Sequence, residues 1–252
     1  MSELDEFYQW IITSPNLIEQ SKLCSNLNAL KPSPVAPDTE YHGNYRLGFV
    51  YQHLCTQAFI NSPHYQLLAE EIQLSEQGRT LGAIDLIVHN LAQDITEHWE
   101  VAIKFYLLHK GHWYGPNAHD QLELKLPHMV NHQLQMSQSD AFKQQCPELN
   151  VNSHHLLLQG RLYINPFNHE IVPSHCLDFK LNSSQINGYW CHYSQAHQIK
   201  ETLYALPKVR WATGKLPDSP IVEPNPQRFI HAQTDSGRFW FVVPDAWPEQ
   251  NA

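Results

Sequence analysis

Two adjoining apolar segments that contain charged residues constrain this chain most. Residues 80–88 (TLGAIDLIV) contain one acid, Asp85, and residues 98–108 (HWEVAIKFYLL) contain Glu100 and Lys104. A charged side chain in such a segment costs free energy unless it is paired or bound to a metal. These three residues therefore belong either to a structural ion pair or to a functional site.

Both segments are predicted to be β-strands. The polar stretch between them, residues 89–94, is short enough to form an antiparallel hairpin. In the second strand, alternation places Trp99, Val101 and Ile103 on one apolar face, and Glu100 and Lys104 on the other. The hairpin therefore predicts that Asp85, Glu100 and Lys104 lie on the same side of a sheet.

The surrounding pattern predicts an α/β fold. Helical spacing is found in residues 1–30 and 44–60, a strand is expected at 65–74, and a turn at 77–79. A further helix is expected to start at Asn117 and to be interrupted by Pro127, and residues 155–164 read as a strand. The order from 44 to 165 is helix, three strands, helix, strand, which predicts a mixed central sheet.

Three regions are expected along the chain. Residues 1–40 form an N-terminal helical arm that ends in a Pro-rich linker (KPSPVAP, residues 31–37). Residues 41–168 form the core. Residues 169–252 form a Trp-rich extension that packs on the core, with a hairpin around residues 236–237.

Composition narrows the classes of protein. A formal net charge of -9 with only 16 Lys and Arg argues against a broad basic face for nucleic acid but is compatible with a narrow groove. The five Cys form no CxxC pair, which disfavours a disulfide framework or a zinc ribbon. The N-terminus lacks the features of a signal peptide, and no apolar run reaches the roughly 20 residues of a membrane span. We therefore expect a cytoplasmic protein without a membrane partner.

The charged residues suggest one kind of chemistry. The carboxylate oxygens of Asp85 and Glu100 suit Mg²⁺ or Mn²⁺. A lysine such as Lys104 can orient an attacking water and stabilise developing negative charge. Together they indicate metal-assisted phosphodiester hydrolysis, while a structural ion pair between Asp85 and Lys104 is the open alternative. The neighbouring pairs His154-His155 and Cys191-His192 match no closed zinc pattern.

Three segments carry a family resemblance: residues 80–85 (TLGAID), 99–107 (WEVAIKFYL) and 115–120 (GPNAHD). They resemble a bacterial family catalogued as domain of unknown function 1853, which is grouped with the PD-(D/E)XK nuclease superfamily. The resemblance implies a nuclease-like α-β-β-β-α-β core, with Asp85 as the metal-binding aspartate and Lys104 as the catalytic lysine. The helix after the Lys104 strand often adds a polar residue to such sites, and Lys125 and Gln133 are the candidates.

The chain departs from the superfamily pattern at two places. The second acid usually lies two residues before the lysine, where this chain has Ala102, and Glu100 lies one strand repeat further away. The Cα atoms of Glu100 and Lys104 are then about 13 Å apart, against about 7 Å for the usual spacing. The helix before the strands also lacks an acid, at residues 51–53 (YQH).

These departures support an alternative function, a catalytically degenerate nuclease-fold module that binds nucleic acid or a protein partner. A third interpretation is a structural protein that uses its Trp-rich tail as an interface.

Overall fold

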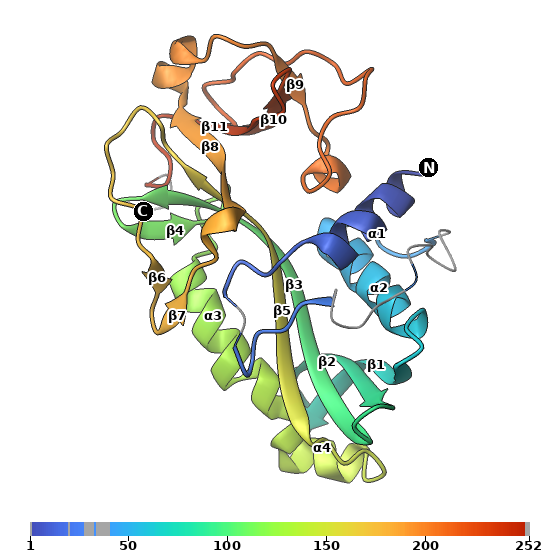
Figure 1. The fold of residues 1–252 in the computed structure, drawn as a ribbon. Coiled ribbons are helices and arrows are strands. Elements are labelled where there is room, and N and C mark those ends of the chain that lie inside the picture. Colours follow the sequence, from blue (N-terminus) through green and yellow to red (C-terminus); the bar gives the residue numbers. More distant parts are fainter. Residues whose placement is uncertain (1, 20, 28–32, 34–40, 250–252) are drawn as a thin grey trace. The chain divides into compact units, whose positions relative to one another are not determined.

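The computed structural model describes residues 2–19, 21–27, 33 and 41–249 and shows an α/β protein with a mixed sheet (Figure 1). The α-helices are α1 (Glu3–Thr13), α2 (Leu47–Ile60), α3 (Leu122–Asn131) and α4 (Asp140–Gln145). Short 3-10 helices are η2 (Gln133–Gln138), η3 (Ser183–Gln185), η4 (Tyr193–Gln198) and η5 (Lys208–Arg210). The strands are β1 (Tyr65–Glu76), β2 (Arg79–Asn90), β3 (Ile95–His109), β4 (His112–Tyr114), β5 (Ser153–Ile164), β6 (His175–Cys176), β7 (Phe179–Lys180), β8 (Ile186–His192), β9 (Leu203–Ala205), β10 (Ile230–Thr234) and β11 (Phe239–Val243).

The chain forms two compact units. The first unit comprises Met1–Asn16, Gln20–Ile103 and Leu126–Gln159, and the second comprises Leu17–Glu19, Lys104–Lys125 and Gly160–Ala252. β3, α3 and β5 each contribute residues to both units. The region boundaries expected at residues 40 and 168 stay predictions.

An antiparallel meander forms the sheet of the first unit. β1 and β2 pair from Tyr65↔Asn90 to Glu76↔Arg79, around a turn in which Gln77 and Gly78 both have positive φ. That backbone matches the twist of a tight hairpin, so the predicted turn is confirmed. β2 and β3 also pair antiparallel, which confirms the second predicted hairpin.

Alternation along β3 separates two layers of the first unit. The Trp99 ring meets Phe59 of α2 edge-on, with ring centroids 5.1 Å apart. The adjacent residue, His98, bonds instead to Ser137 of η2. Because successive side chains of a strand point to opposite faces, α2 covers one face of β3 and η2 covers the other. The order helix, three strands, helix, strand expected over residues 44–165 is present, with β4, η2 and α4 in addition.

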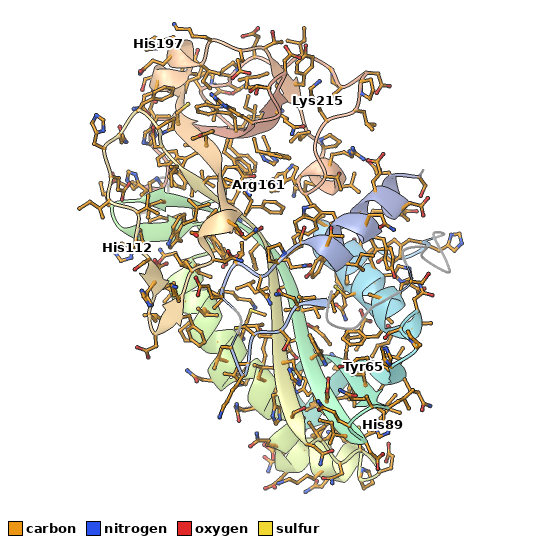
Figure 2. All side chains as sticks on the ribbon, in the orientation of Figure 1. Tyr65, His89, His112, Arg161, His197 and Lys215 are labelled. Carbon is orange, nitrogen blue, oxygen red and sulfur yellow. The ribbon has the colours of Figure 1, made fainter. Side chains whose placement is uncertain are left out.

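The second unit contains the parallel strand pairs. β5 pairs with β8 and β8 with β11 in parallel, whereas β10 is antiparallel to both β11 and β9. The predicted hairpin at residues 236–237 is confirmed as the β10–β11 connection. The buried guanidinium of Arg161, labelled on β5 in Figure 2, lies 3.4 Å from the centroid of the Phe239 ring and donates to the carbonyl of Trp211. The second unit therefore buries a cation against an aromatic ring and backbone carbonyls.

Tryptophan is concentrated in the second unit. Of the seven Trp in the chain, Trp10 and Trp99 belong to the first unit. The remaining five are buried in the second: Trp113, Trp190, Trp211, Trp240 and Trp247. The four Trp of the expected extension, residues 169–252, are therefore buried in the second unit.

Two predicted helices have different limits in the structure. The helix expected over residues 1–30 ends at Thr13, because Ser14 precedes Pro15 and has an extended backbone. The helix expected from Asn117 begins at Leu122. Asn117 instead accepts a hydrogen bond from the amide of His119, and Ala118 has a left-handed backbone that cannot continue a helix.

α3 runs from Leu122 to Asn131 through Pro127, so the helix is not interrupted there, and the expected kink stays a prediction. The expected linker at residues 31–37 lies outside the described residues, apart from Ser33. Within the described part of the chain, no helix combines the length and apolarity needed to span a membrane.

The close approach of two strands in the second unit yields a stability prediction. Gly160 has φ +142°, and a methyl group built on it would overlap the backbone of Lys104. We expect Gly160→Ala to destabilise the protein by about 3 kcal/mol, because backbone atoms cannot move aside as a flexible side chain does. Gly48→Ala is the control, since Gly48 lies in α2 with no neighbour within 4 Å. Urea unfolding measures both, and equal midpoints for the two variants would contradict the prediction.

Candidate functional site

Asp85 and Glu100 meet where the pairing of β2 with β3 ends. The last paired residues are Leu86 and Trp99. Beyond them, Oδ2 of Asp85 accepts a hydrogen bond from the amide of Val101 at 2.9 Å. Oε1 of Glu100 in turn accepts from the amide of Asp85 at 3.4 Å. The two carboxylates thus replace backbone pairing with crossed side-chain hydrogen bonds, so Asp85 and Glu100 lie together in the first unit. The expected placement of Lys104 on the same side of the sheet stays a prediction.

Glu100 is fully buried and is held at both oxygens. Oε1 lies 2.9 Å from Nε2 of His98, and Oε2 accepts from the side-chain amide of Gln133 at 2.8 Å. His98 is also fully buried, and this burial lowers the pKa of its imidazole to about 4. A neutral His98 donates to Glu100 from Nε2 and therefore accepts at Nδ1.

A hydrogen-bonded chain continues from His98. Its Nδ1 lies 2.9 Å from the hydroxyl of Ser137, and that hydroxyl lies 3.1 Å from Nε2 of the half-buried His154. Ser137 donates to His98 and accepts from His154 in the arrangement that satisfies all three groups. Because Ser137 belongs to η2 and His154 to β5, this chain fixes the orientation of the Glu100 carboxylate through two further elements.

The carboxylate of Asp85 has a strongly raised pKa. Burial and, secondly, the neighbouring Glu100 raise its pKa to about 8. The amide of Val101 and the imidazole of His98 oppose this rise. The Asp85 residue as a whole is half-buried, so solvent reaches part of it. Two nearby acids that cannot both ionise easily form a site that a positive charge would stabilise.

The helix α2 contributes no acid near this pair. Burial raises the pKa of Tyr51 well above its usual value, and Asp85 contributes to that rise. The Tyr51 hydroxyl donates to Oε1 of Gln159 at 2.8 Å. α2 therefore adds no third carboxylate to the Asp85–Glu100 pair.

The donor set suits a partly hydrated cation. Within the described residues, no group of three or more His, Cys, Asp or Glu side chains is arranged to hold a metal ion. Mg²⁺ in proteins is commonly held by one or two carboxylates and completes its shell with water and substrate phosphates. Asp85 and Glu100, whose proximity disfavours two negative charges, fit such an ion but not a closed protein cage.

Lys104 has a defined partner in the second unit. Its ammonium lies 2.6 Å from Oδ2 of Asp120, and the hydroxyl of Tyr106 donates to the same oxygen at 3.3 Å. Lys125 is half-buried in the first turn of α3. The catalytic roles of Lys104 and Lys125 stay predictions.

Sequence analysis did not identify three residues of these networks. His98 could have been found, since it lies two residues before Glu100 and so shares its strand face. Asp120 lies inside the segment GPNAHD, but its pairing with Lys104 depends on how the loop folds. Ser137 carries no signal in the sequence, because it reaches His98 from a separate 3-10 helix.

These features define an α/β protein with a buried carboxylate pair between two strands. The family model described as "Domain of unknown function (DUF1853)" matches residues 7–234. The chain therefore belongs to the DUF1853 family, as the segments around Asp85, Lys104 and Asp120 predict. Comparison with curated proteins and with solved structures gave no match.

The raised pKa of Asp85 predicts how the metal-free fold responds to pH. Its ordinary value is 3.8 and its value in the fold is about 8, so between these limits the folded chain keeps a proton that the unfolded chain loses. The contribution of Asp85 to the free energy of unfolding should therefore fall as pH rises through this range, while buried histidines such as His98, whose pKa is lowered to about 4, contribute in the opposite sense below about pH 6.5. Asp85→Asn carries no titratable group there, so between pH 5 and pH 8 its stability should fall less, or rise more, than that of the unmodified chain.

Urea unfolding at about pH 5 and about pH 8 measures this difference. Asp218→Asn serves as the matched control, since Asp218 is exposed. The prediction is contradicted if Asp85→Asn loses as much stability between the two pH values as the unmodified chain does.

Proposed function

We propose that this protein is a Mg²⁺- or Mn²⁺-dependent, nuclease-like enzyme that hydrolyses phosphodiester bonds of nucleic acid. The observation that carries the proposal is the Asp85–Glu100 pair. Burial and, secondly, the neighbouring Glu100 raise the pKa of Asp85 to about 8, and Oε1 of Glu100 accepts from the amide of Asp85. The chain also belongs to the DUF1853 family. Its segments 80–85, 99–107 and 115–120 carry the resemblance to PD-(D/E)XK nucleases.

The residues have distinct roles in this proposal. Asp85 and Glu100 would hold the cation, while His98 and Gln133 orient Glu100 by bonding to its two oxygens. A bound divalent cation supplies positive charge that stabilises the phosphate during displacement. In this proposal Lys104 would orient the attacking water. Its ion pair with Asp120 restricts the positions of its ammonium.

A non-catalytic module is the second candidate, and specific observations favour it. Both oxygens of Glu100 already accept hydrogen bonds, and Ala102 occupies the usual position of the second acid. A site with few free oxygen ligands binds metal weakly. In this alternative, the nuclease-like fold binds nucleic acid or a protein without cleaving it.

Metal binding tests the first step of the proposal. In calorimetric titrations with MnCl₂, we expect one ion per chain, and no binding in Asp85→Asn or Glu100→Gln. Gln133→Ala should weaken binding about tenfold, because Oε2 of Glu100 then loses its hydrogen bond and the carboxylate can rotate. Asp94→Asn removes an exposed acid and should leave the affinity unchanged. Binding that persists in both Asp85→Asn and Glu100→Gln would contradict the assignment of the ligands.

Hydrolysis tests the second step. Single- and double-stranded DNA and RNA are incubated with the full chain and Mn²⁺, and products are separated on denaturing gels. We expect cleavage by the unmodified protein and at least a hundredfold slower cleavage by Asp85→Asn and by Lys104→Met. Cleavage at an unchanged rate in both variants would reject the site. Mn²⁺ binding without cleavage of any substrate would favour the non-catalytic module.

A further inference from the structure

The second unit contains a cleft of about 500 Å³. The loop 116–119 forms one wall, and residues 227–229 with Pro244 and Trp247 form the rest. The volume lies within the roughly 300–1,000 Å³ typical of small-ligand sites. The loop belongs to the segment GPNAHD, one of the three segments that carry the family resemblance.

The charge of this cleft differs from that of the whole chain. The formal net charge of the chain is -9, yet no Asp or Glu lines the cleft. Arg228 and His119, both exposed, do line it. Among the described residues, no ion pair neutralises Arg228. The residues that line the cleft therefore carry one formal positive charge, that of Arg228, and no formal negative charge, which suits an anion.

Two aromatic residues give the cleft an apolar wall. Phe229 is half-buried, and its ring contacts Trp211 and Phe241 with centroid distances of 6.2 and 5.9 Å. Trp247 is held against Trp190 at 4.9 Å. Rings fixed in this way lose little freedom when a flat ligand stacks on them.

The opposite wall is also formed in advance. The amide of Gly115 donates to the carbonyl of Asp120 at 2.7 Å, and the amide of Ala118 donates to the carbonyl of Gly115 at 2.8 Å. The Asp120 side chain is fixed by its ion pair with Lys104. The loop therefore closes on itself without a ligand, and binding requires little ordering.

We propose that this cleft binds a nucleotide, with the base against Phe229 and the phosphate at Arg228. A planar apolar ligand that also carries negative charge matches an aromatic wall beside an arginine. The choice of a nucleotide over other aromatic anions rests on the proposed function. The nucleotide is either free or part of a single strand, and both present the same chemistry to the cleft.

Fluorescence anisotropy with a fluorescein-labelled 12-nucleotide DNA single strand tests the proposal. The measurement is made at low salt in EDTA, so that it does not depend on a metal. We expect Arg228→Gln to weaken binding about tenfold and to reduce the slope of log affinity against log salt by about 0.7. Arg79→Gln is the matched control, because Arg79 is exposed at the turn between β1 and β2 in the first unit.

A second measurement separates the two sources of nucleotide. AMP and inorganic phosphate are titrated into the protein by calorimetry. Strand binding that depends on Arg228 identifies a nucleic acid, and AMP binding that depends on Arg228 without strand binding identifies a free nucleotide. Either result supports the proposal. Without Arg228-dependent strand binding, equal affinity for AMP and inorganic phosphate would overturn it, as would affinities for the strand and AMP that Arg228→Gln leaves unchanged.

The same experiment distinguishes the failure of this inference from the failure of the proposed function. Arg228-dependent binding in EDTA by a chain that does not bind Mn²⁺ rejects the metal site and supports the cleft. If Mn²⁺ binding depends on Asp85 but nucleotide binding is unchanged by Arg228→Gln, the cleft is rejected and the metal site is supported.

Discussion

The hydrogen bond from the amide of Val101 to the carboxylate of Asp85 is the interaction on which the candidate site depends. Regular pairing of β2 with β3 ends at Leu86 and Trp99, the residues next to Asp85 and Glu100. An unpaired backbone amide inside a sheet is unfavourable, and Asp85 satisfies it with a side chain. The same contact brings Asp85 beside Glu100, so strand architecture and site geometry have one origin.

A second buried acid on β3 shows what distinguishes this pair. Glu97 is 2% exposed and accepts hydrogen bonds from Nε1 of Trp99 and from the side-chain amide of Asn90, both at 2.8 Å. These donors are neutral and stabilise the carboxylate without another acid beside it. Glu100 is similarly held by His98 and Gln133, but it also faces Asp85. Glu97 therefore has the environment of a structural carboxylate, and only Glu100 shares its surroundings with a competing negative charge.

Local patterns predicted the hairpins, because strand alternation and turn residues act over a few neighbouring positions. The proximity of Asp85 and Glu100 followed from the same alternation. The hydrogen-bonded chain through Ser137 and His154 could not be predicted, since it needs the positions of η2 and β5 against β3. The pairing of Lys104 with Asp120 could not be predicted for a related reason: the sequence predicts a helix start at Asn117, where the structure has a loop that holds Asp120. A left-handed Ala118 gives no warning in the sequence.

The uneven distribution of tryptophan has a consequence for optical measurements. Five of the seven indoles lie in the second unit, whereas the first unit has Trp10 and Trp99. Trp99 stacks on His155 with ring centroids 4.6 Å apart. Intrinsic fluorescence of the whole chain is therefore weighted toward the second unit by the number of its indoles, and a fluorescence melting curve reports mainly on that unit. Backbone circular dichroism, to which both units contribute through their strands and helices, gives the more balanced signal.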